Sequence, residues 1–86
     1  MKVQGAAISL SGKRFAVVVV GSQITQNAGE ADMAIESIQP AFGGVPVILM
    51  SQNDQGSPSY YGDQEIVALL ADVPIDKMPW KEYTIA

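Results

Sequence analysis

The chain has 86 residues, of which 48% are apolar and 16% are charged, with a net charge of -4 and no histidine or cysteine. A chain of this length folds as one domain, residues 1–86, because two separate cores would each be too small to be stable. The missing residue types exclude Ser-His-Asp and Cys-His catalysis, zinc fingers and disulfides. We therefore expect a non-enzymatic module without a cofactor or a bound metal ion.

The charges and the hydropathy also limit the partners and the location. An acidic chain is a poor nucleic-acid binder, because Lys and Arg side chains supply most of the affinity for phosphates. The N-terminus has no apolar stretch of signal-peptide length, and the longest apolar run, residues 15–20, is far too short to span a bilayer. We expect a cytoplasmic protein that binds neither nucleic acid nor membranes.

The first predicted element is an antiparallel hairpin. Residues 3–10 have moderate strand character, and residues 15–20 are dense in the β-branched side chains that favour strands. Between them Ser11, Gly12, Lys13 and Arg14 predict a tight turn, in which Gly12 takes a positive φ. The second strand is apolar on both alternating faces, which indicates a strand covered on both sides.

An amphipathic helix follows a polar loop over residues 22–27. Asn27 is a suitable N-cap, and Glu30 stands three residues later, at the capping-box position. Pro40 disfavours helical geometry at Gln39, where we expect the regular helix to end. The apolar stripe of this helix has spacings of four, three and four residues: Ala31, Ile35, Ile38 and Phe42.

The rest of the chain predicts a strand over residues 45–50, a long loop over 51–62, a second helix and a last strand over 80–85. Asp63 caps the second helix and Pro74 closes it. The element order is ββαβαβ, which predicts an α/β (or α+β) domain with a four-stranded mixed sheet, an N-terminal hairpin and two helices. Trp80 is expected in the core, and at least one of Tyr60 and Tyr61 at the surface. The residues expected to be buried are Val18, Ile35, Ile38, Ile48, Leu69 and Leu70.

Two strand orders satisfy the right-handed crossover rule. In order 1-2-3-4 both helices cover one face of the sheet, and the bare apolar face indicates a partner interface. In order 4-1-2-3 the helices cover opposite faces and no partner is required. Because one short helix hardly covers a face of a four-stranded sheet, we favour a homo-oligomer. A two-fold dimer is the commonest form, and its interface would use the sheet face or the edge near residues 80–85.

The candidate ligand site is the crevice at the carboxyl ends of the second and third strands, the usual ligand position in open α/β sheets. Its polar groups suit recognition better than proton transfer, although the same residue types also cap helices and solvate loops. The predicted lining residues are Ser22, Gln23, Thr25, Gln26, Asn27, Ser51, Gln52, Asn53, Asp54, Tyr60 and Tyr61.

The charges predict an acidic edge and a basic edge. The crevice edge carries five acids, which disfavours a phosphate ligand, and most of them stand in the first helical turns, where they complement the helix dipole: Glu30, Asp32, Asp54, Asp63 and Glu65. The opposite edge carries basic residues: Lys13, Arg14, Lys77 and Lys81. A divalent-cation site using Asp54 with Asp63 or Glu30 is a further alternative.

Two functions therefore stay open. The leading hypothesis is a module that self-associates or binds a partner, because its strands are apolar on both faces and the chain is short. The alternative is a small polar-ligand binder, or a minimal enzyme, that uses the 22–27 and 51–61 loops.

Overall fold

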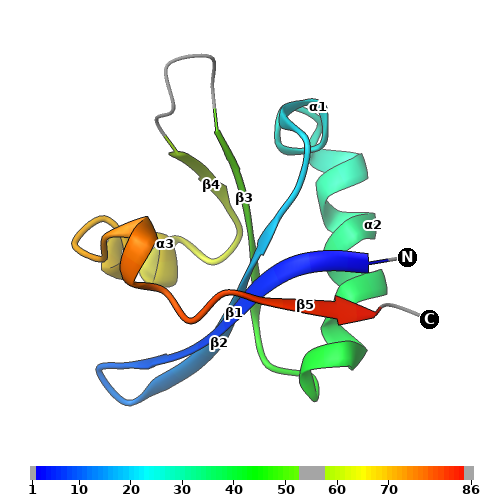
Figure 1. Cartoon of the computed structure of the whole chain (residues 1–86). Coiled ribbons are helices and arrows are strands. Elements are labelled where there is room, and N and C mark those ends of the chain that lie inside the picture. Colours follow the sequence, from blue (N-terminus) through cyan, green and yellow to red (C-terminus); the bar gives the residue numbers. More distant parts are fainter. Residues whose placement is uncertain (1, 53–57, 85–86) are drawn as a thin grey trace.

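The computed structural model describes residues 2–52 and 58–84, which form a five-stranded sheet with helices on both of its faces (Figure 1). The strand order is β4-β3-β2-β1-β5. The strands are β1 Lys2–Leu10, β2 Lys13–Val19, β3 Val47–Gln52, β4 Pro58–Tyr61 and β5 Lys81–Thr84. The helices are α1 Ser22–Thr25, α2 Ala28–Ile38 and α3 Gln64–Leu70, with 3-10 turns η1 Gln39–Phe42 and η2 Ile75–Lys77.

The predicted hairpin is present, with β1 antiparallel to β2. Its turn consists of Ser11 and Gly12, with φ angles of 52° and 78°. Positive φ at both central residues is the signature of a type I′ turn, whose twist matches that of the two strands.

The predicted caps and the end of the first helix are also confirmed. Asn27 Oδ1 accepts a hydrogen bond from the Glu30 N–H at 3.2 Å, at the start of α2. The helix passes at Gln39 into η1, with Pro40 in its first turn, and Gly43 ends it at a φ of 74°.

The polar loop predicted over residues 22–27 contains a short helix, α1. Ile24 packs against the buried cluster on the α2 side, and the Thr25 hydroxyl donates to the Ser22 carbonyl at 3.0 Å. One apolar anchor and local hydrogen bonds hold a single turn that has no sequence periodicity of its own.

The prediction of four strands is wrong, because β4 lies within the predicted loop over residues 51–62. It pairs antiparallel with β3, with Tyr61 opposite Leu49 and Ser59 opposite Ser51. Pro58 and Ser59 are not typical strand residues, so the sequence pattern does not predict this strand. Pro58 is tolerated because it begins an edge strand. The pairing with β3 therefore stabilises a strand whose first two residues have little strand propensity.

The strand order decides between the two topologies. β5 pairs with β1, so of the two orders that the sequence left open the structure has 4-1-2-3, with β4 added beside β3. On one face α2 packs over a cluster that includes Ala16, Val18 and Leu49. On the other, α3 packs over a cluster that includes Val17 and Ile48. The central strands are covered on both faces, so residues 2–52 and 58–84 do not form the bare apolar face expected from order 1-2-3-4.

Most of the predicted core is correct. Val18, Ile38, Ile48 and Leu70 are at most 2% exposed, whereas Ile35 and Leu69 are only partly buried. In α3 Ile66 and Leu70, one turn apart, face the sheet, which leaves Leu69 on the flank.

The aromatic predictions have mixed outcomes. Trp80 is half-buried against the α3-side cluster rather than inside the core. Tyr60 and Tyr61 are both half-buried, so neither is fully exposed.

Among the described residues, no helix has the length and apolar character to cross a membrane.

The neighbours Leu69 and Leu70 test the orientation of α3. We expect Leu70→Ala to lower the free energy of unfolding by about 2 to 5 kcal/mol, because it leaves a cavity under the helix. Leu69→Ala should cost about 1 kcal/mol or less, as at partly exposed positions. Urea denaturation followed by circular dichroism measures both, and equal losses would contradict the assigned face.

Candidate functional site

The carboxyl ends of β2 and β3 lie side by side, as predicted. The two strands are parallel, and the Val20 N–H donates to the Met50 carbonyl at 2.8 Å beyond the paired region. The hydroxyls of Thr25 and Ser51 are hydrogen bonded to each other at 2.8 Å, and Ser51 is only 2% exposed. These two members of the predicted crevice therefore satisfy each other at the junction of α1 and β3.

The remaining members at this edge have separate positions. Ser22, Gln23, Gln26 and Gln52 are exposed, and the Asn27 side chain caps α2. Two more predicted site residues, Asn53 and Asp54, lie outside the described residues. The divalent-cation site predicted to use Asp54 therefore cannot be placed among the described residues either. Within the described part of the chain, no group of three acidic side chains is arranged to hold a metal ion.

The two tyrosines are carried away from this edge by β4. Because β4 runs antiparallel to β3, Tyr60 lies opposite Met50 and Tyr61 opposite Leu49, further back along the sheet. α3 consequently begins near the amino end of β3 rather than its carboxyl end. The crevice predicted from the two loops is therefore divided between two places.

The same reversal corrects the predicted charge map. Lys13, predicted on the basic edge, forms an ion pair with Glu65, predicted on the acidic edge. This ion pair and the nearby Asp63 carboxylate raise the pKa of Lys13, the hydrogen bond to Glu65 being the largest cause. Asp63 and Glu65 thus lie at the amino end of β3, and the prediction that all five acids share one edge is wrong.

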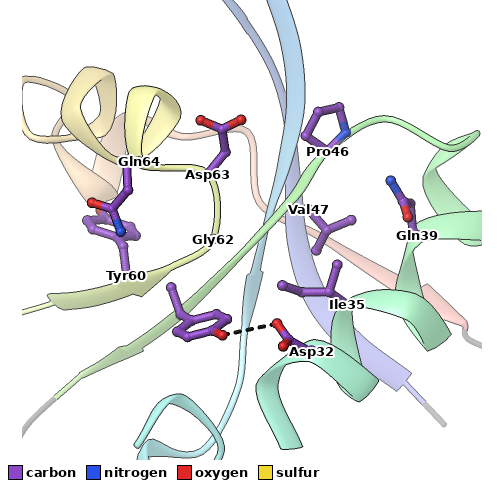
Figure 2. A pocket seen from close by; sticks show the side chains of 10 residues that line it. Asp32, Ile35, Gln39, Pro46, Val47, Tyr60, Gly62, Asp63 and Gln64 are labelled. Atoms are coloured by element: carbon purple, nitrogen blue, oxygen red, sulfur yellow. Dashed lines mark hydrogen bonds between the residues drawn. The ribbon is translucent and has the colours of Figure 1, made fainter. Parts of the chain in front are cut away.

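A pocket of about 420 Å³ opens beside the end of β4, between α2 and the start of α3 (Figure 2). We call it the edge pocket. Tyr60 and Tyr61 are the predicted site residues that contribute to it. It is lined by Asp32, Ile35, Gln39, Pro46, Val47, Tyr60, Tyr61, Gly62, Asp63 and Gln64.

The edge pocket exists because β4 leaves β3 early. Tyr61 is the last paired residue of β4, so Val47 and Ile48 have no strand neighbour on that side among the described residues. Gly62 then turns the chain across β3 at a φ of 149°. A Cβ at this position would lie 2.6 Å from Ile48 Cδ1 and 3.2 Å from the Val47 carbonyl oxygen. Glycine is therefore required for the approach that forms the floor of the pocket.

A hydrogen bond closes one end of the edge pocket. The Tyr61 hydroxyl donates to Asp32 Oδ1 at 3.0 Å, which joins β4 to α2 (dashed line in Figure 2). This bond raises the pKa of Tyr61, because the protonated phenol is the form that donates. Burial raises the pKa of Tyr60. Both phenols are therefore protonated at neutral pH.

Two further lining side chains hold the surrounding backbone. Gln39 Nε2 donates to the carbonyls of Gly44 and Val45, at 3.1 and 3.2 Å. Asp63 Oδ1 accepts from the Glu65 N–H at 2.9 Å, as the N-cap of α3. The polar walls of the pocket are thus fixed by bonds to the adjacent turns.

Sequence reasoning missed most of this site. Asp32 lies on α2 and Gln39, two turns later, is the first residue of η1, while Gly62 stands between a pair of tyrosines and a helix cap. That Tyr-Tyr-Gly-Asp run is a local signal for a sharp turn. Without β4, however, nothing indicates that the turn faces α2.

Comparison of the chain with protein-family models, with curated proteins and with solved structures gave no match.

The Tyr61–Asp32 hydrogen bond makes a prediction about pH. Because the pKa of Tyr61 is raised in the folded protein, the bond contributes stability below the ordinary tyrosine pKa of 10.0, and this stability is lost as the pH rises above that value. Tyr61→Phe should remove one step in tyrosine absorbance above the ordinary tyrosine pKa, and Asp32→Asn should move that step to lower pH. An unchanged titration in Asp32→Asn would show that the bond is absent in solution.

Proposed function

We propose that this domain is a binding module that holds a small polar ligand in the edge pocket. The observation that carries the proposal is that the lining comes from several separate elements and mixes apolar with polar side chains. Ile35 lies on α2 and Gln39 at its C-terminal end, while Asp63 and Gln64 lie on the opposite side of the pocket (Figure 2). Concave sites with a few fixed polar groups are typical of ligand pockets, and the volume of about 420 Å³ is in their usual range.

The same lining favours binding over catalysis. None of the ten lining residues is a serine, threonine, cysteine, lysine or histidine, so the pocket wall offers no common nucleophile beside a base. The partner of Asp32 is a tyrosine whose pKa is raised above its ordinary value. A phenol with a raised pKa stays protonated near neutral pH and is poorly suited to general acid-base catalysis there, which supports a recognition role.

Self-association remains a second proposal, now restricted to the edges of the sheet. The observation that favours it is that β5 pairs only with β1 among the described residues, which leaves its outer edge for a second copy. Lys81 and Glu82 are exposed on this strand, and such charges commonly limit edge pairing. Sedimentation equilibrium at micromolar concentration measures it directly.

The binding function is tested with a fragment set of small amines, amides, alcohols and carboxylates, followed by amide chemical shifts of labelled protein. We expect at least one compound to shift residues 32–39 and 60–64 in a saturable manner. Gln64→Trp, which places a bulky ring at the pocket wall, should weaken that compound about tenfold or more by exclusion.

Gln23→Trp is the matched control, because Gln23 is also exposed on a helix but lies in the predicted carboxyl-edge crevice. It should leave binding unchanged. Loss of binding in Gln23→Trp alone would place the ligand in that crevice, and the absence of any saturable shift would refute the proposal.

A further inference from the structure

We infer that the ligand of the edge pocket is a small organic cation that carries ammonium or guanidinium N–H donors. This inference rests on the proposed binding function and specifies the chemistry of its ligand. It follows from the hydrogen-bonding groups that the pocket still has available, from its charge and from its aromatic side chains.

The side chains on the α2 side of the pocket have used their hydrogen-bond donors. Both N–H groups of the Gln39 amide are used by the carbonyls of Gly44 and Val45. The Tyr61 hydroxyl proton is used by Asp32 Oδ1. What remains on this side is acceptor capacity, namely Gln39 Oε1 and the second carboxylate oxygen of Asp32. Such a wall matches a ligand that donates hydrogen bonds.

The opposite wall has the same preference. Asp63 uses Oδ1 for the Glu65 N–H, which leaves its second oxygen as an acceptor. Tyr60 and Gln64 carry donors as well, but a hydroxyl and an amide both accept hydrogen bonds too. Among the side chains, a donating ligand therefore finds acceptors on both walls, whereas an accepting ligand finds free donors only on Tyr60 and Gln64.

The charge of the pocket selects the sign of the ligand. Asp32 and Asp63 line it, and none of the ten lining residues is basic. The nearby Lys13 is engaged by Glu65. The field therefore attracts a cation and repels a carboxylate or phosphate. The phenol rings of Tyr60 and Tyr61 add a surface that attracts cations to its face.

An organic cation fits this lining better than a metal ion. Divalent cations prefer six or more oxygen ligands, and the described residues offer no group of three acidic side chains. A pocket of about 420 Å³ instead has room for a short carbon chain with a cationic end at each wall.

The test compares three compounds with the same four-carbon chain: 1,4-diaminobutane, 1,4-butanediol and succinate, which are a dication, a neutral molecule and a dianion. Each is titrated into labelled protein at low salt. We expect saturable shifts at residues 32–39 and 60–64 with the diamine, which should bind about tenfold or more tightly than the diol, because its hydrogen bonds are charge-assisted. Succinate should give no shift there.

Charge-matched variants separate the pocket from general attraction to an acidic protein. Asp32→Asn and Asp63→Asn should each weaken the diamine about fivefold or more, since each removes one charge-assisted bond. Both keep an acceptor for the Tyr61 hydroxyl or the α3 cap, so the fold should persist. Asp72→Asn, an exposed position outside the lining, makes the same change in net charge and should have no effect.

The inference is overturned if the diol or succinate binds as tightly as the diamine, or if Asp72→Asn weakens binding as much as the pocket variants. Binding of a neutral compound in the pocket without any binding of the diamine would refute the inference that the ligand is a cation. It would leave the proposed binding function intact. No binding of any compound would refute both.

Discussion

The central constraint on this fold is that β2 and β3 are apolar on both faces. Val17 and Val18 are adjacent on β2 and point to opposite sides of the sheet, and neither is exposed to solvent. The same holds for Ile48 and Leu49 on β3. Strands of this kind must be covered on both sides. This chain of 86 residues meets that requirement by sending its two longer helices to opposite faces.

The short strand β4 makes this arrangement possible. After β3 the chain turns back along its own sheet, so that α3 starts at the other end and crosses the second face before β5 pairs with β1. The reversal has a local consequence, because β4 ends at Tyr61 and leaves the first residues of β3 without a neighbour. The edge pocket forms in this gap, floored by Gly62 and walled by α2 and the start of α3.

The features that sequence predicted are those with local causes. The tight hairpin turn with positive φ at Gly12, the Asn27 and Asp63 caps and the end of α2 each depend on residues within one turn of the chain. β4 could not be predicted in this way, because its four residues begin with Pro58 and Ser59 and derive their stability from pairing with β3. Because β4 was not predicted, the start of the second helix was placed at the wrong end of the sheet. Tyr60 and Tyr61, which precede that helix, were misplaced with it. Of the predicted site residues, Tyr60 and Tyr61 line the edge pocket, whereas Asp32 and Gln39, which meet them only in three dimensions, were not among the predicted site residues.

The most direct test of the covered sheet is to place a lysine on each face of β2. Because Val17 lies under α3 and Val18 under α2, both Val17→Lys and Val18→Lys should lose native circular dichroism and the cooperative unfolding transition. Ala7→Lys, at an exposed position on β1, is the control and should remain folded. If either valine variant keeps the native spectrum and unfolds cooperatively near the parent, that face of the sheet is open and the account is wrong.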